Sequence, residues 1–209
     1  MTVLNKIAYY QNRRDEVPNQ ELARELVESK DTAGIREIAE NLWNEDRNVA
    51  NDCIKVLYEI GYLAPELIAD YVGDFLKFMQ SRNNRLVWGT ILALSTIASL
   101  KAGAIFPHVE EIEKVMENGS VITIDNGVKI LAIVASQNEV YRTEIFPYLL
   151  NHLTTCRPKD VPQHSEKTLV AVNAANKGEF IAVLEKRMED LQGAQVTRVK
   201  KVIREAEKR

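Results

Sequence analysis

The histidines and cysteines are the residues with which this chain could bind a metal or carry out nucleophilic chemistry. Its 209 residues include three histidines, His108, His152 and His164, and two cysteines, Cys53 and Cys156. The histidines show neither HExxH nor HxxxH spacing, and we assign no Cys/His pair the spacing of a ligand pair. We therefore predict no metal site and no cofactor.

Motifs for phosphate binding and covalent catalysis are missing from the sequence as well. It contains no GxGxxG, no GxxxxGK[ST] and no GxSxG. Most carboxylates fall in acidic segments such as residues 21–28 and 110–117, where solvation explains them. The sequence predicts no catalytic residues, and we interpret the chain as a non-enzymatic protein.

A segment that repeats every 37 residues organises the chain instead. RLVWGTILALSTIA, residues 85–98, has counterparts in NVANDCIKVLYEIG, residues 48–61, and ITIDNGVKILAIVA, residues 122–135. The segments between them, residues 68–79 and 105–116, also align at 37, and a third copy at 145–156 follows a longer connection. Apolar residues recur at helical spacing in each segment, so each repeat predicts two helices.

The sequence before and after the repeats predicts capping helices within a single domain. Residues 2–13 predict an N-terminal helix and Asp31 predicts a helix N-cap. We expect cap helices over residues 1–30, repeats over 31–192, and a C-terminal capping helix over 193–209. The Lys/Arg-rich face of that last helix is interpreted as the polar outer surface that terminal repeats need.

Two-helix units of 37–40 residues with recurring I-x-V/A/I-L-x-x-I/V-G/A columns resemble HEAT repeats, which are armadillo-type helical repeats. The resemblance implies an all-α fold, a right-handed α-α superhelix of about five to six helical pairs, with the second helices on its concave side. Members of this class include scaffolds, transport adaptors and repair enzymes, so the resemblance does not specify an activity.

The concave positions of the second helices give the candidate binding residues. Equal positions of stacked repeats lie about 10 Å apart, which predicts one row from Asn51, Trp88 and Asp125 and a second from Lys55, Leu92 and Lys129. Arg85 lies one turn before Trp88. The predicted partner-binding residues are Asn51, Lys55, Arg85, Trp88, Asp125 and Lys129.

The role of Trp88 has two interpretations that the sequence leaves open. A tryptophan on the polar side of a helix, rimmed by charged and amide side chains, is typical of an interface anchor. The same residue could instead pack against a neighbouring repeat. Trp43 follows Leu42 directly and is interpreted as packing between the first repeats.

Composition predicts a cytoplasmic, monomeric protein that binds a protein or peptide. A formal charge of −3 and a pI near 5.8 argue against a nucleic-acid partner. No segment is apolar enough to span a membrane, and the N-terminal residues have neither the uninterrupted apolar region nor the small-residue cleavage site typical of a signal peptide. The distant Cys53 and Cys156 predict free thiols, with Cys53 buried.

The alternative function is DNA binding, or an activity like that of the alkylpurine DNA glycosylases. Those enzymes resemble this chain in length and fold, and place a tryptophan and a catalytic acid one turn apart. Here Leu92 follows Trp88 and Arg47 follows Trp43 at that spacing. The acid is therefore not where the glycosylase site requires it.

Overall fold

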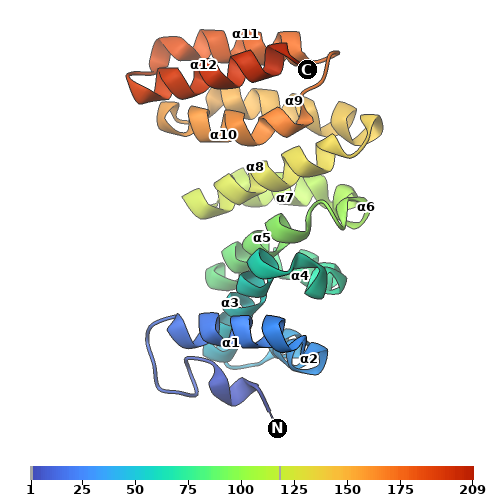
Figure 1. The fold of residues 1–209 in the computed structure, drawn as a ribbon, viewed down its shortest axis with the longest axis vertical. Coiled ribbons are helices and arrows are strands. Elements are labelled where there is room, and N and C mark those ends of the chain that lie inside the picture. The colour runs from blue at the N-terminus through green and yellow to red at the C-terminus, as the bar shows by residue number, and fades with distance from the viewer. Residues whose placement is uncertain (1, 118) are drawn as a thin grey trace. The chain divides into compact units, whose positions relative to one another are not determined.

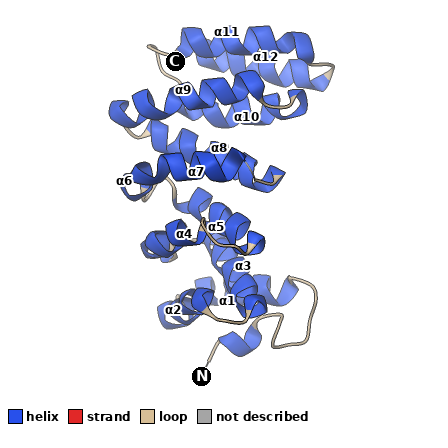
Figure 2. Cartoon of the chain, turned by 180° about the vertical axis from the view of Figure 1, so that it is seen from behind, coloured by secondary structure: helices blue, strands red, loops and turns tan. Residues whose placement is uncertain are grey.

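The computed structural model describes residues 2–117 and 119–209 (Figure 1). All regular secondary structure in those ranges is helical, as Figure 2 shows. The contacts divide the chain into two compact units, Met1–Asn126 and Gly127–Arg209. The all-α fold predicted from the sequence is confirmed.

The first unit consists of short helices joined by tight turns. Its 3₁₀ turns are Leu4–Lys6, Asn41–Trp43, Pro65–Leu67, Ala69–Tyr71 and Phe106–His108. Its α-helices are α1 (Val17–Ser29), α2 (Thr32–Glu40), α3 (Arg47–Leu63), α4 (Val72–Phe78), α5 (Asn84–Ile97), α6 (Ala102–Ile105) and α7 (Val109–Glu117).

The second unit begins within α8 (Val121–Ser136) and contains two further helical pairs. Its 3₁₀ turns are Pro158–Asp160, Leu169–Ala171 and Met188–Asp190. Its remaining α-helices are α9 (Glu139–Thr155), α10 (Val161–Thr168), α11 (Lys177–Arg187) and α12 (Ala194–Glu207).

The 37-residue repeat predicted from the sequence is present in the helix boundaries. The second helices α3, α5 and α8 begin at Arg47, Asn84 and Val121, each 37 residues after the last. Within the first unit α3 packs between α1 and α5, and α4 packs on α5. Helices α1, α3, α4 and α5 thus bury their apolar faces against one another, as neighbouring units of a helical repeat do.

Helix α5 is buried on more than its predicted core face. Ile91 and Leu94 are fully buried, as the apolar spacing predicts. Leu92, predicted to lie in the second row of concave positions, and Ser95, three residues after it, are also buried, with exposed fractions of 8% and 2%. The prediction fails because both α3 and α4 pack on this helix and cover more than one of its faces.

The N-terminal helix predicted over residues 2–13 does not form beyond one 3₁₀ turn, Leu4–Lys6. The apolar residues of that segment are nevertheless buried, Ile7 and Ala8 among them. The backbone N–H of Ala8 donates to the Asn19 side-chain oxygen at 2.9 Å instead of to a helical carbonyl. Contacts with α1 therefore override the local helical pattern.

Pro147 lies inside α9, not in the first turn of a helix as its alignment with Pro107 predicts. The helix starts earlier because Asn138 caps it, its side chain accepting from the Tyr141 N–H at 3.0 Å. Residues 139–144, interpreted from the sequence as a connection, therefore extend the helix before the proline.

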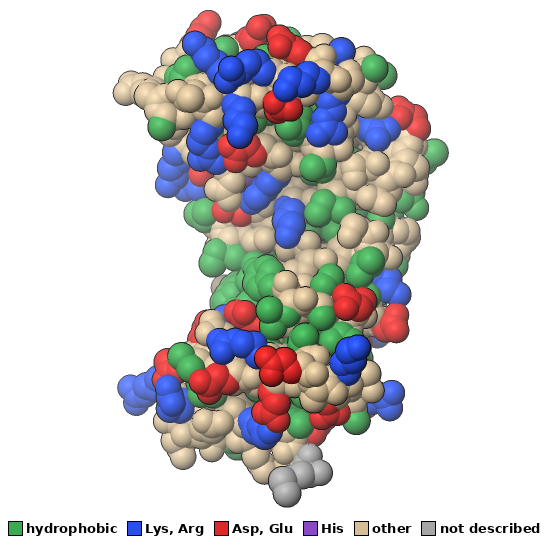
Figure 3. All heavy atoms as spheres, in the orientation of Figure 1, with side chains coloured by type: hydrophobic (Ala, Val, Ile, Leu, Met, Phe, Trp, Pro, Cys, Tyr) green, Lys and Arg blue, Asp and Glu red, His purple; other side chains and the backbone are tan. Residues whose placement is uncertain are grey.

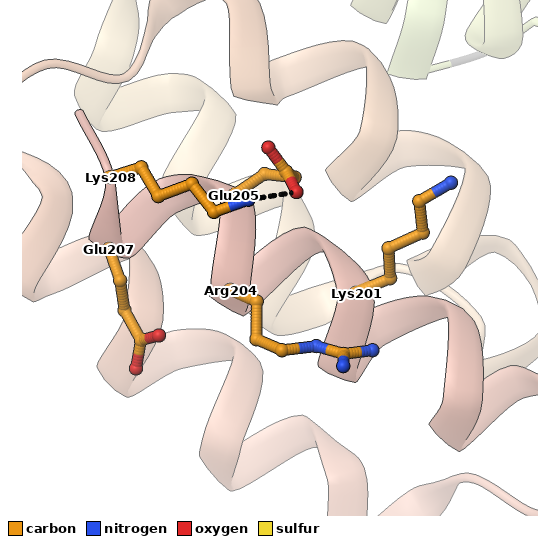
Figure 4. A pocket seen from close by; sticks show the side chains of 5 residues that line it. All are labelled: Lys201, Arg204, Glu205, Glu207 and Lys208. Atoms are coloured by element: carbon orange, nitrogen blue, oxygen red, sulfur yellow. Dashed lines mark hydrogen bonds and ion pairs between the residues drawn. The ribbon is translucent and has the colours of Figure 1, made fainter.

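The last helix of the described residues, α12, is buried along a narrow apolar stripe. Val199, Val202, Ile203 and Ala206 of α12 are buried, and α12 packs on α10 and α11. Its charged side chains fan apart around a shallow hollow, where only Lys208 and Glu205 form an ion pair among those drawn in Figure 4. These residues do not converge on a common point, which agrees with a solvated outer surface.

Two glycines test how closely the helices of the first unit approach. A Cβ added to Gly61 in α3 would lie 2.3 Å from Thr96 Oγ1 and 2.8 Å from Ile68 Cδ1, whereas one added to Gly73 in α4 would meet nothing within 4 Å. We expect Gly61→Ala to lower the free energy of unfolding by about 1–3 kcal/mol, because the added methyl group would overpack the core. Gly73→Ala should raise it by up to about 1 kcal/mol.

Urea denaturation of both variants measures this difference. Since both substitutions replace a helical glycine with the same residue, equal effects would mean that the approach at Gly61 is not tight.

Candidate functional site

Four charged side chains from three segments form a connected network in the first unit. Lys55 Nζ in α3 lies 2.9 Å from Glu16 Oε2 and 2.7 Å from Glu59 Oε1. Arg85 Nη2, at the start of α5, lies 2.9 Å from Glu16 Oε1. Glu16, the residue before α1, therefore joins α3 and α5 through one carboxylate.

Lys55 is the buried centre of this network, with an exposed fraction of 6%. Burial by itself favours the neutral amine, but hydrogen bonds with Glu59, Tyr58 and Glu16 outweigh it and raise the pKa of Lys55. Its ammonium also lies 4.7 Å from the centre of the Tyr58 ring. Lys55, predicted to contact a partner, has its charge satisfied within the protein.

Trp88 is half-buried and forms the wall of a hollow. Its ring centre lies 6.1 Å from that of Tyr58, itself only 5% exposed. The hollow has a volume of about 350 Å³. Its other lining residues are Asn84, Val87, Lys114, Val115, Gly119, Ser120 and Thr123. Trp88 thus packs against Tyr58 on one side and lines a hollow on the other, and its role as an interface anchor stays a prediction.

A second, more polar hollow lies beside the first turn of α5. It has a volume of about 300 Å³, and Asn51, Arg85 and the segment 13–16 are among its lining residues. Asn51 Oδ1 accepts a hydrogen bond from Asn83 Nδ2 at 2.8 Å. Because Arg85 and Trp88 lie three residues apart on α5, the two hollows flank the same helical turn.

The remaining predicted site residues lie on α8. Asp125 and Lys129 are four residues apart on this helix and both are half-buried. Burial lowers the pKa of Lys129. Asp125 belongs to the first compact unit and Lys129 to the second. Of the six predicted residues, Asn51, Lys55, Arg85 and Trp88 are brought together around the facing turns of α3 and α5.

Trp43 is the more exposed of the two tryptophans. Its ring packs on Phe78, with ring centres 4.5 Å apart, which agrees with contact between the first repeats. The Lys77 ammonium lies 5.7 Å from the same ring. The residue is nevertheless 57% exposed, so most of its surface is not covered by that packing.

A cluster that the sequence analysis missed lies in the second unit. His152 Nε2 and His164 Nδ1 are hydrogen-bonded at 2.9 Å, with one ring donating and the other accepting. One ligand atom from each of His152, Cys156 and His164 lies within 4.8 Å of the others. The signal was available, because His152 and Cys156 are four residues apart at the end of a helix and so share a face.

Burial dominates the electrostatics of this cluster. Burial, with repulsion from His164, lowers the pKa of His152 to about 4. Burial also raises the pKa of Cys156, against the opposing influence of the Arg187 guanidinium. Cys53 in the first unit is fully buried and its thiol pKa is raised by that burial. Both cysteines are free thiols, as predicted.

Arg187 fixes the end of α9 next to this cluster. Its side chain is buried, 7% exposed, and donates to three carbonyl oxygens of the last turn: Leu153 at 2.5 Å, Thr154 at 2.8 Å and Cys156 at 2.8 Å. These carbonyls have no partner within the helix, so a buried guanidinium that binds all three stabilises the helix terminus.

Comparisons with solved structures show the fold. An engineered protein has 18% sequence identity with this chain and a TM-score of 0.70, with 100% of this chain and 98% of that chain covered. A designed armadillo repeat protein has 11% identity and a TM-score of 0.68, over 90% of this chain and 87% of its own. A third, at 16% identity and a TM-score of 0.68, is a designed armadillo repeat protein in complex with the peptide (KR)4, over 90% and 86%.

These likenesses show that the chain has an armadillo-like helical-repeat fold. No family model matches the sequence. No curated protein matches it either. Across the described residues, no helix combines the length and the apolar character needed to cross a bilayer.

The network around Lys55 predicts that loss of a buried ion pair lowers the free energy of unfolding more than loss of an exposed one. Glu59→Gln leaves the ammonium of a 6%-exposed lysine with one carboxylate fewer, and we expect a loss of about 1–3 kcal/mol in the free energy of unfolding. Asp15→Asn breaks the exposed pair with Arg13 and should cost less than about 1 kcal/mol.

Chemical denaturation of both variants at one pH measures the two losses. If Asp15→Asn lowered the free energy of unfolding as much as Glu59→Gln, the buried network at Lys55 would contribute no more to stability than an exposed ion pair.

Proposed function

We propose that this protein is a non-enzymatic interaction module that binds a segment of another protein on the first unit, with Trp88 as the anchor. The observation that carries the proposal is the accessible side of Trp88, which walls a hollow of about 350 Å³. Tryptophan is among the residue types enriched at the hot spots that dominate binding energies.

The lining of the Trp88 hollow suits an apolar side chain. Val87 and Val115 line it together with Trp88, and Asn84, Ser120 and Thr123 provide polar groups there. An apolar centre with polar groups around it is the usual anatomy of an interface. A leucine, methionine or aromatic residue of the partner would therefore occupy this hollow.

The charge of the unit around the hollow favours a cationic partner, whereas the charged residue that lines the hollow itself is Lys114. Helix α7, which contributes Lys114 and Val115 to the lining, carries four glutamates within its nine residues. Burial and repulsion from Glu110 and Glu117 raise the pKa of Glu113. The first unit as a whole has 20 acidic against 13 basic residues. Lysine or arginine next to the apolar anchor would relieve this repulsion.

The structural comparison is compatible with a peptide partner. One designed armadillo repeat protein with the same fold was solved in complex with (KR)4, a basic peptide. That protein shares 16% of its residues with this chain, so it supports the kind of partner and not its sequence. We therefore propose a peptide segment with one apolar anchor and flanking Lys or Arg residues.

DNA glycosylase activity has no comparable support. Leu92, one turn after Trp88, is buried and apolar, and Arg47 occupies the equivalent position after Trp43. The acidic excess of the first unit opposes duplex DNA, whose binding depends on cation–phosphate contacts. DNA therefore serves as a competing ligand in the test.

A monomer in the cytosol is the setting we propose, in keeping with two free cysteines.

A peptide library displayed on phage and selected on the purified protein tests the proposal. We expect selected peptides to share an apolar residue flanked by Lys or Arg. Trp88→Ala should weaken binding of a labelled consensus peptide by at least about 30-fold, which corresponds to the 2 kcal/mol of an interface hot spot. Fluorescence anisotropy measures the affinity, and circular dichroism verifies that the variant is folded.

Trp43→Ala is the matched control, because it removes the other tryptophan of the same unit, which is exposed and lies outside the hollow. An equal loss in both variants, or an unchanged affinity for Trp88→Ala, would overturn the proposed anchor. A labelled DNA duplex titrated at low salt provides the competing arm. Tight, salt-sensitive DNA binding without any selected peptide would favour the nucleic-acid function instead.

A further inference from the structure

We propose that His152, Cys156 and His164 form a binding site for a thiophilic divalent cation, of which Zn²⁺ is the representative. The three residues come from the end of α9 and the first half of α10, and all lie within the second unit. Two imidazoles and one thiolate are a ligand set that Zn²⁺ prefers, and three protein ligands leave a fourth position for water.

The distances between the donors are close to those that a metal requires. With metal–ligand bonds of about 2.0–2.3 Å, tetrahedral geometry places two nitrogens about 3.3 Å apart and a nitrogen and a sulfur about 3.6 Å apart. The nitrogens of His152 and His164 that face each other are 2.9 Å apart, and the ligand atoms of all three residues lie within 4.8 Å. Opening the histidine pair by a few tenths of an ångström and turning the thiol inward would complete the arrangement.

Both histidines point a ring nitrogen toward the same place, which a structural hydrogen bond alone would also explain. The third donor distinguishes the two interpretations. Cys156 is the residue that caps α9: its N–H bonds to the His152 carbonyl at 2.8 Å, and its thiol donates weakly to the Leu153 carbonyl at 3.8 Å, a contact that metal binding would replace. A thiol in that position adds nothing to a histidine–histidine hydrogen bond, whereas it supplies the third ligand of a metal site.

The surroundings hold the ligands in place. Arg187 binds the carbonyl oxygens of Cys156 and of two residues before it. Its positive charge also favours the thiolate form of Cys156. His164 is 1% exposed, so its ring is fixed by packing. Rigid outer contacts of this kind orient the ligands and contribute to metal affinity.

Binding changes the protonation of the cluster in a defined way. In the metal-free pair one imidazole donates its facing N–H to the other ring. For both facing nitrogens to bind the cation, that ring must shift its proton to its other nitrogen, with no net loss. The Cys156 thiol releases one proton to solvent and binds as the thiolate. One proton is therefore released for each cation bound.

Accessibility permits the cation to enter. His152 and Cys156 are half-buried, whereas His164 forms the inner wall. The site therefore opens at the surface on the side of α9. The cation would join α9 to α10 across the 3₁₀ turn Pro158–Asp160, so binding should stabilise the second unit.

Cobalt substitution in the untagged full-length protein tests the site. Co²⁺ is added alone, and we expect saturation at one ion per chain, with visible absorption of four-coordinate Co²⁺ and a thiolate-to-cobalt band in the near ultraviolet. Zn²⁺ should displace the cobalt and raise the midpoint of thermal unfolding. Cys156→Ser should abolish the thiolate band and weaken binding by more than about 100-fold, since changes to outer contacts alone cost 10–100-fold.

His152→Gln provides a second variant, because His152 is half-buried and its replacement does not leave a cavity in the core. The matched controls are His108→Gln and Cys53→Ala, which remove the same residue types outside the cluster and should leave the stoichiometry and spectrum unchanged. An unaltered cobalt spectrum in Cys156→Ser, or binding of less than one ion per chain at micromolar protein, would overturn the proposal.

Thiol modification supplies a readout that does not depend on cobalt. Cys53 is fully buried, so Cys156 is the thiol that reacts with an alkylating reagent in the native protein. Zn²⁺ should slow that reaction markedly in the parent protein and in Cys53→Ala, and should have no such effect in His152→Gln. Equal rates with and without Zn²⁺ in the parent would contradict the site.

Discussion

Close packing of α5 against α3 is the constraint on which the first unit depends. Gly89 of α5 faces Ile54 of α3 so closely that an added Cβ would lie 2.8 Å from Ile54 Cγ1. That approach buries Ile54 and Ile91, with exposed fractions of 1% and 0%. Neither helix could bury its apolar surface alone, so each depends on packing against its neighbours in the repeat. The same packing fixes where Trp88 lies, since it precedes Gly89 directly.

The sequence was sufficient for the repeat because the repeat is a local pattern. Apolar spacing predicted the helices α3, α5 and α8. The residue type of Asp31 predicted a helix N-cap, and its side chain accepts from the Gly34 N–H at 2.9 Å. Periodicity failed where a distant contact decides the backbone. The segment around Ile7 has helical spacing, yet the Ala8 N–H bonds to Asn19 of α1, the Tyr9 N–H bonds to Asp52 of α3, and its regular structure is one 3₁₀ turn.

The candidate binding residues could be located on their helices but not described chemically from the sequence. Periodicity placed Lys55 on α3 and Arg85 on α5. It could not reveal that Glu16, 39 residues before Lys55, would neutralise both. Ion pairs between distant segments depend on the turn before α1, which has no repeat to predict it. The hydrogen bond between His152 and His164 likewise depends on the turn between α9 and α10, which the repeat pattern does not predict.

Net charge conceals a difference between the two units. The overall value of −3 combines a first unit with 20 acidic and 13 basic residues and a second with 10 acidic and 14 basic. Figure 3 shows Lys and Arg side chains gathered over α10 and α12. Each unit therefore presents its own electrostatic field, and the average over the chain describes neither. Because screening limits these fields to about 8–10 Å, a partner responds to the unit it touches. The acidic unit is the one that carries Trp88, so the charge of the whole chain is the wrong guide to its partner.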